Sequence, residues 1–223
     1  MRKEIRYTID YIDYVKIIKV LEAIMKKDKN SEANGRYSVR TIYLDNYYHE
    51  IANNKKNDIN SVNKYRIRMY NRSEDSIYLE RKMNENGFIK KTKVKISEKE
   101  VQDIIKGNIR NFLEETASLK TELYINMRLK HIRPVLLIDY ERTAFVDEVS
   151  NTRVTLETNI KSTMDCTRFF SKVEQKNTNH YVLEIKYDKY IPEYIKILVS
   201  SIERKKITNS KNRKELDKFQ IWG

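Results

Sequence analysis

The chain has 223 residues, 39% of them hydrophobic and 35% charged, and a formal net charge of +13. Its length predicts one domain, residues 1–223. Its charge predicts a polyanionic partner. Composition alone does not decide whether this partner is nucleic acid, an anionic membrane or a phosphate-rich small molecule. The single cysteine excludes a disulfide framework and a cysteine-based zinc site and favours the reducing cytoplasm, and the sequence contains neither a signal peptide nor an apolar run that could span a bilayer.

The first half of the chain predicts a series of strands with one helix among them. The helix follows Asp10 or Asp13, either of which can cap it, and runs to about Lys27. Residues 46–63, which are rich in Asn and Lys, predict a loop. The expected strands alternate apolar and polar residues and cover 3–9, 37–45, 64–70, 76–83 and 88–96.

The second half predicts helices and longer strands in turn. A capping box, SEKE at 97–100, starts one helix, residues 112–131 form another, and Pro192 stands where a last helix would begin. The expected strands are 133–147, 151–160 and 181–188. About eight strands, mostly joined by hairpins and interrupted by helices, predict an α+β fold built on an antiparallel sheet or barrel.

The strands repeat one design, an apolar face and a face of cations with an occasional carboxylate. Because successive strand side chains point to opposite sides, Lys64, Arg66 and Arg68 share one face. The corresponding sets are Glu4 and Arg6; Ser38 and Arg40; Tyr78, Glu80 and Lys82; Lys91, Lys93 and Lys95; Arg153, Thr155 and Glu157; and Val182, Glu184 and Lys186. If these faces line one barrel, its lumen must be wet and hold a multiply charged anion, since burying so many like charges unpaired would be prohibitive. A linear phosphate chain fits, with the glutamates as ligands of a hard divalent cation.

Each part of this pattern also has a purely structural interpretation. Arg66 and Arg68 could pair with Glu80 across the hairpin, Glu184 could be an ordinary salt-bridge partner, and the lysines of 88–96 could form a solvated face. The three histidines are scattered, without the spacing of a metal site or a catalytic triad. It is the recurrence of the pattern in strand after strand that favours a binding site.

Nine short motifs, taken in order, resemble the VTC domain, the polyphosphate polymerase branch of the triphosphate tunnel metalloenzyme (CYTH-like) superfamily. The motifs are EIRY (4–7), SVRTIYLD (38–45), KYRIRMY (64–70), YLERK (78–82), KKTKVKI (90–96), LLIDYERTAF (136–145), RVTLET (153–158), VLEIK (182–186) and SKN (210–212). The resemblance covers nearly the whole chain. It implies an antiparallel β-barrel tunnel of about eight strands with a charged lumen and helices packed outside, Mn²⁺ or Mg²⁺ as cofactor, and ATP with polyphosphate or inorganic triphosphate as ligands.

The resemblance and the charged faces together give three sets of expected site residues. The catalytic residues would be Arg66, Arg68, Lys82, Arg142 and Arg153. The further phosphate-binding residues would be Arg6, Arg40, Lys91, Lys93, Lys186 and Lys211. The metal ligands would be Glu184, Glu4 and Glu80.

The chain departs from the family's pattern in three respects. Arg6 stands where the family usually has Lys, and the superfamily signature Glu-x-Glu-x-Lys reads Arg2-x-Glu4-x-Arg6, which argues against the thiamine-triphosphatase branch. The closing Ser-Lys-Tyr reads Ser-Lys-Asn at 210–212. The SPX sensor and transmembrane parts of the yeast form are missing, so coupling to membrane transport would need association with separate membrane or regulatory proteins.

Four functions are compared. The leading interpretation is a cytoplasmic polyphosphate polymerase, which transfers the terminal phosphoryl group of ATP to a growing chain by positioning and charge neutralisation, without a covalent protein intermediate. A triphosphatase of the same fold would use Glu4 or Glu80 to position water. A non-catalytic polyphosphate-binding module is the third. A nucleic-acid binder should expose aromatic residues among its cations, whereas Tyr7, Tyr65 and Tyr187 fall on apolar faces, so no nucleic-acid partner is expected.

Overall fold

The computed structural model describes residues 3–28, 35–48, 62–85, 88–114, 118–173 and 181–200. The strands are β1 (Lys3–Ile9), β2 (Lys26–Lys27), β3 (Arg36–Asp45), β4 (Val62–Tyr70), β5 (Ile77–Glu85), β6 (Phe88–Lys95), β7 (Arg133–Asp147), β8 (Thr152–Thr163) and β9 (Tyr181–Tyr187). The helices are α1 (Tyr11–Ile24), α3 (Glu98–Lys106), α4 (Leu119–Leu129) and α5 (Glu193–Ser200), with short 3₁₀ turns η1 (Glu74–Ser76), η2 (Arg110–Glu114) and η3 (Cys166–Phe170). The α+β class is confirmed.

The strands pair in the order β1-β9-β8-β7-β3-β4-β5-β6, and β2 pairs with β7. The pairs β1–β9, β8–β9, β3–β4, β4–β5 and β5–β6 are antiparallel, as expected for strands linked by hairpins and by inserted helices. In the described residues β1 and β6 end this order, each with one strand neighbour, so the closure of the sheet into a tunnel stays a prediction.

The chain forms two compact units, each assembled from segments far apart in the sequence. Unit 1 takes its residues from Met1–Ser38, Tyr140–Lys161 and Lys176–Lys211. Unit 2 takes its residues from Val39–Asp139, Ser162–Gln175 and Asn212–Gly223. The chain therefore passes between the units within β3, within β7 and within β8, and the expectation of a single domain stays a prediction.

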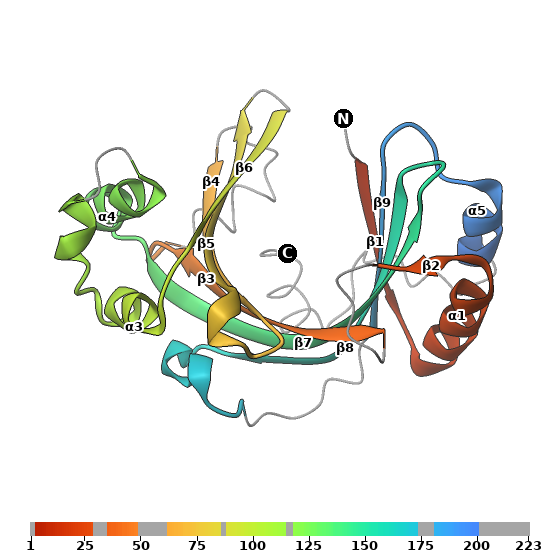
Figure 1. Ribbon diagram of the computed structural model, residues 1–223, viewed down its shortest axis with the longest axis horizontal. Coiled ribbons are helices and arrows are strands. Elements are labelled where there is room, and N and C mark those ends of the chain that lie inside the picture. Colours follow the sequence, from red (N-terminus) through yellow and green to blue (C-terminus); the bar gives the residue numbers. More distant parts are fainter. Residues whose placement is uncertain are drawn as a thin grey trace. The chain divides into compact units, whose positions relative to one another are not determined.

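In unit 1, α1 and α5 pack on one side of β1, β9 and β8 (Figure 1). The core between helices and strands contains Ile9, Tyr14, Ile17, Leu21, Met25, Phe145, Val154, Leu156, Leu183, Ile185, Ile195 and Val199. Tyr7 and Tyr187 pack against this core, as their place on apolar faces predicted. Since strand side chains alternate, the charged residues of the same strands lie on the face away from the helices.

The start of α1 agrees with the sequence prediction, but its end does not. Asp10 is the cap, and its side chain accepts a hydrogen bond from the Asp13 N–H at 2.8 Å. The helix ends at Ile24, because Lys26 and Lys27 leave it and pair with Val146 and Phe145 of β7. The predicted extension of this helix to about Lys27 is therefore wrong.

In unit 2, α3 and α4 lie on one side of β4 and β5 (Figure 1). The capping box is confirmed, since Ser97 and Glu100 exchange the two hydrogen bonds that define it. Helix α4 begins only at Leu119, after its cap Ser118, so the expected helix over 112–131 is too long at its start. Part of the expected loop over 46–63 is also strand, because Val62 opens β4, while 49–61 lie outside the described residues.

A partly buried polar network attaches α4 to the hairpin β4–β5. Tyr65 and Arg81 are direct cross-strand partners, and both hydrogen-bond to the Glu122 carboxylate of α4. Asn126, one turn later, donates to the Tyr65 hydroxyl at 3.1 Å. The face of the hairpin that carries Tyr65 and Arg81 is therefore covered, and the alternate residues lie on its other face.

Candidate functional site

Unit 1 carries an ion-pair network centred on Glu184 of β9, whose side chain is 1% exposed. Its Oε2 accepts a hydrogen bond from Arg6 Nε at 2.7 Å, and its Oε1 accepts one from Lys186 Nζ at 2.5 Å. Glu4 binds the same two cations, with Oε1 2.9 Å from Arg6 Nε and Oε2 3.6 Å from Lys186 Nζ. Register explains this, because β1 places Arg6 opposite Glu184 and Glu4 opposite Lys186.

The surrounding cations keep Glu184 ionised. Burial alone would raise the pKa of its carboxyl, but the charges of Arg6, Lys186 and Arg142 outweigh burial and hold that pKa well below its usual range. Burial lowers the pKa of Lys186, and the attraction of Glu184 and Glu4 offsets only part of this shift. The network therefore presents a permanent carboxylate together with one lysine that holds its proton less firmly than usual.

A second buried pair joins Arg142 of β7 to Glu157 of β8. Arg142 Nη2 donates to Glu157 Oε1 at 2.5 Å and to the Tyr140 hydroxyl at 3.0 Å. Glu157 Oε2, Arg142 Nε and one guanidinium nitrogen of Arg6, Nη1, are buried and have no hydrogen-bond partner in the described part of the chain. Because orphaned buried polar atoms are costly, they mark places where a bound ion, water or ligand atom is expected.

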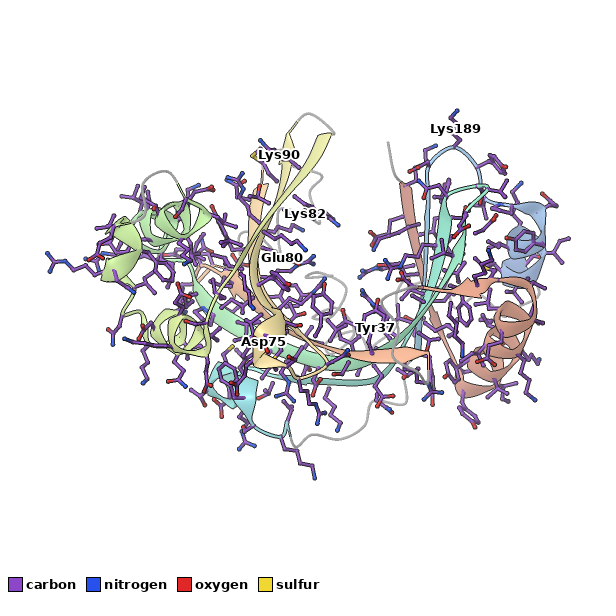
Figure 2. The ribbon with its side chains drawn as sticks, in the orientation of Figure 1. Tyr37, Asp75, Glu80, Lys82, Lys90 and Lys189 are labelled. Atoms are coloured by element: carbon purple, nitrogen blue, oxygen red, sulfur yellow. The ribbon has the colours of Figure 1, made fainter. Side chains whose placement is uncertain are left out.

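Arg153 of β8 is held in the same unit by neutral and acidic partners. Its Nη2 donates to the Tyr37 hydroxyl at 2.8 Å and lies 3.0 Å from Asp28 Oδ2. The guanidinium carbon of Arg142 lies 6.0 Å from the centre of the Tyr37 ring and 5.3 Å from that of Tyr140, within reach of a cation–π attraction. Figure 2 labels Tyr37 at this position. Both arginines are thus restrained before any ligand binds.

Unit 2 carries a grid of cations on the face of β4, β5 and β6 that α4 leaves uncovered. Figure 2 shows Glu80 and Lys82 projecting from β5 on the side away from α3 and α4. The register of the three strands defines three cross-strand rows: Lys64–Lys82–Lys91, Arg66–Glu80–Lys93 and Arg68–Tyr78–Lys95. We call the first of these the lysine row. The grid as a whole holds seven cations and one carboxylate.

The one carboxylate of the grid, Glu80, is held by arginine. Arg66 Nε donates to Glu80 Oε2 at 2.7 Å, and Arg68 Nη1 lies 3.9 Å from the same oxygen. Burial would raise the pKa of Glu80, but Arg66 and Arg68 lower it further than burial raises it. The cross-hairpin pairing that offered a structural interpretation is therefore present. Asp75 also lies 3.6 Å from Lys95 Nζ, and the cations of the grid still outnumber these two carboxylates.

Lys64 belongs to this grid, although the expected site residues do not include it. Burial lowers the pKa of its ammonium group to about 8, aided by the positive charges of Lys82 and Arg66 and opposed by Asp45. The sequence does contain a signal for Lys64. It lies two residues before Arg66, and alternate residues of a strand share a face. Glu157, Tyr37 and Asp28 of unit 1 are likewise absent from the expected set, and their roles depend on partners that lie far away in the sequence.

Arg40 lies apart from the cation grid of unit 2. Its register partner is Met69, which puts it on the side of β3 opposite to the residues that face Arg66 and Arg68. The side chain is 3% exposed, and its guanidinium donates to the carbonyl oxygens of Phe169 and Ser171, each at 2.7 Å. It also pairs with Asp139 at 2.6 Å. Arg40 therefore joins η3 to β3 and β7 from the face opposite the cation grid, and phosphate binding by Arg40 stays a prediction.

The remaining expected residues fall into two groups. Unit 1 holds Glu4, Arg6, Arg142, Arg153, Glu184 and Lys186. Unit 2 holds Arg66, Arg68, Glu80, Lys82, Lys91 and Lys93. Lys211 and the motif at 210–212 lie outside the described residues, as does Arg2.

The carboxylates of unit 1 fit a divalent metal ion whose remaining ligands are phosphate oxygens and water. Within the described residues, no three carboxylate, histidine or cysteine side chains stand close enough to hold a metal ion by themselves. Mg²⁺ is commonly bound through one or two carboxylates, with phosphate oxygens and water as its other ligands, and carboxylates also suit Mn²⁺. Glu184, Glu4 and the orphaned Oε2 of Glu157 are hard oxygen donors on three adjacent strands and fit this pattern.

Comparison with known proteins gives one family match. The model of the VTC domain family matches residues 1–219. Among solved structures, a candidate adenylate cyclase from Bacillus halodurans is 12% identical, with a TM-score of 0.48 over 96% of this chain and 98% of that chain. The PH1819 protein from Pyrococcus horikoshii OT3 is 13% identical, with a TM-score of 0.45 over 91% of this chain and 92% of that one. The comparison with curated proteins found no match.

Over the described ranges, none of the helices combines the length and the apolar character that crossing a bilayer requires.

Proposed function

Because the chain belongs to the VTC domain family, among the polyphosphate- and triphosphate-binding tunnel enzymes, we propose that it is a metal-dependent polyphosphate polymerase. It would transfer the terminal phosphoryl group of ATP to the end of a growing polyphosphate chain. As a consumer of ATP, it would work in the cytoplasm.

The observation that carries this proposal is the grid of unit 2. Its rows are two residues apart along each strand, which is about 7 Å at the usual rise of an antiparallel strand. A small compact anion would touch one row, whereas an extended polyanion would touch several. Seven cations against a single carboxylate therefore match a linear phosphate chain better than a single phosphate group.

The carboxylates favour transfer to phosphate over transfer to water. A general base needs a pKa near the working pH, and Arg66 and Arg68 keep the pKa of Glu80 below its ordinary value. Glu4 is engaged by Arg6 and Lys186. Neither acid that could position water in a triphosphatase is thus free for that task. A phosphate acceptor is already ionised and needs no base.

The arginines would supply most of the catalysis. Phosphoryl transfer proceeds with little covalent help from the protein, so that positioning and neutralisation of the phosphate oxygens dominate. Arg66 and Arg68 would bind phosphate oxygens through their remaining N–H groups, and Arg142 and Arg153, already restrained by aromatic and acidic neighbours, would do the same without a large loss of side-chain freedom.

A divalent metal would add to this charge neutralisation. Glu184 and Glu4 would hold Mn²⁺ or Mg²⁺, which would supply electrostatic stabilisation of phosphate oxygens when bound. The residues of this chain keep the carboxylates ionised and in place, through Arg6 and Lys186.

The test is synthesis by the purified protein. Incubation with ATP and Mn²⁺, followed by gel electrophoresis with a phosphate-chain stain, should show long polyphosphate and a matching amount of ADP. Release of orthophosphate alone from ATP or tripolyphosphate would instead identify a triphosphatase. Tight binding of polyphosphate without turnover of ATP would identify a binding module.

A further inference from the structure

The three rows of the grid differ in how their charges are balanced. The middle row has a carboxylate, since Glu80 accepts a hydrogen bond from Arg66 at 2.7 Å. In the row Arg68–Tyr78–Lys95, the tyrosine separates the two cations. The lysine row instead places Lys64, Lys82 and Lys91 opposite one another with no acid among them.

Lys64 lies in a strongly basic environment. Its direct cross-strand partner is Lys82, and like charges at such a position destabilise a sheet. The charges that shift the pKa of Lys64 are those of Lys82 on β5, Arg66 on its own strand and Asp45 on β3, and of these only Asp45 attracts it. Asp45 is fully buried, and no described carboxylate lies within ion-pair distance of Lys64. An anion bound across the row would relieve this repulsion.

The position of the row separates it from the arginines. Along β4, Lys64 lies two residues from Arg66 and four from Arg68, which at the usual strand rise is about 7 Å and about 14 Å. A phosphate group bound between the two arginines therefore does not reach Lys64. A chain that continues along the strand direction does.

We propose that the lysine row is a separate subsite for the phosphate groups of a long polyphosphate chain, and that Lys64 makes binding at this face selective for chain length. The inference rests on the proposed function in assuming a linear phosphate ligand. Short phosphates are held at Arg66 and Arg68, and each additional phosphate that reaches the row adds attraction from Lys64, Lys82 and Lys91.

The test compares two lysine-to-methionine variants. Lys64→Met removes the charge from the row and keeps the length of the side chain. Lys90→Met is the matched control, because Lys90 is exposed, lies opposite Met83, and alternates to the other face of β6 from Lys91. Binding of tripolyphosphate and of a long-chain polyphosphate is measured by titration calorimetry on the full chain, and unfolding temperatures are measured without ligand.

Lys64→Met is expected to affect binding of the long chain more than binding of tripolyphosphate. Lys64→Met should weaken binding of the long chain roughly tenfold and binding of tripolyphosphate less than about twofold, whereas Lys90→Met should change both less than about twofold. Without ligand, Lys64→Met should melt no lower than the wild type, since it removes a like-charge contact.

Other outcomes separate this inference from the proposed function. Equal losses for both ligands, no loss for either, or a clearly lower melting temperature would overturn the role of Lys64 and leave the polymerase proposal standing. If Lys64→Met weakens binding of the long chain selectively but the wild type makes no polyphosphate, the role of the lysine row is supported and the proposal of a polymerase is refuted. A wild type that binds neither ligand would refute both.

Discussion

Arg6 of β1 lies directly opposite Glu184 of β9, and its Nε and Nη2 both donate to one oxygen of that carboxylate. The two residues are 178 positions apart in the sequence. The other oxygen accepts from Lys186, so a single buried carboxylate holds two cations in place.

Glu184→Gln should abolish metal-dependent turnover, because a neutral amide is a poor ligand for a hard cation. It should also lower stability, since it leaves Arg6 and Lys186 beside an uncharged group, and breaking a buried pair by removing one partner costs about 3–5 kcal/mol. Activity across a Mn²⁺ titration and urea unfolding would measure both effects. Turnover restored to the wild-type level at saturating Mn²⁺ would remove Glu184 from the metal site.

The matched control is Asp103 on α3, a helix that lies on the side of β4 and β5 away from the cation grid. Asp103→Asn makes the same carboxylate-to-amide change and should leave turnover within about twofold of the wild type. A similar loss in both variants would mean that the effect of Glu184→Gln is unrelated to its position.

Arg66→Ala combined with Arg68→Ala should weaken tripolyphosphate binding severely. A hydrogen bond to a charged group contributes roughly 1.5–3 kcal/mol, so two lost ligands predict a decrease of a hundredfold or more. Titration calorimetry would measure it, with Arg128→Ala, an exposed arginine on α4, as the control. The wild type should also bind tripolyphosphate far more tightly than a DNA duplex of equal charge, and comparable DNA affinity would favour the nucleic-acid interpretation.

Arg40→Ala should act on stability and not on ligand binding. The substitution removes the donors to the carbonyls of Phe169 and Ser171 and leaves Asp139 with Arg72 as its remaining cation. We expect a loss of about 3–5 kcal/mol in unfolding free energy, measured with urea, and unchanged tripolyphosphate affinity in the folded protein. A variant as stable as the wild type that had lost tripolyphosphate affinity would instead support phosphate binding by Arg40.

The affinity for long-chain polyphosphate should fall as the pH rises through about 8. Burial and the neighbouring cations lower the pKa of Lys64 to about 8, so that above this pH its ammonium group loses the proton that attracts phosphate. The sign for stability is opposite, because the unfolded chain binds more protons than the folded chain between about pH 8 and the ordinary lysine value near 10.5, and the contribution of Lys64 to stability without ligand rises with pH there.

Calorimetry at constant ionic strength between pH 7 and pH 9.5 would test this pH dependence. Lys64→Met should flatten the part of the profile centred near pH 8, and Lys90→Met should retain it. A profile that is the same in all three proteins would assign the titration to another group.

The sequence by itself determined those features that depend on neighbours in the chain. The common face of Lys64, Arg66 and Arg68 follows from the two-residue period of a strand, and the start of α3 follows from the capping box at Ser97 and Glu100. Both can be predicted correctly because the residues involved are at most four positions apart.

Only the tertiary structure decided which residues lie opposite one another. Arg40 has the charge of a phosphate ligand, yet the register of β3 with β4 puts it beside Met69 and against the carbonyls of η3. The partner of Glu184 and the members of the lysine row likewise depend on register. Register is set by hydrogen bonds and packing between distant segments, and a shift of one residue would move every side chain to the other face, so local sequence cannot determine it.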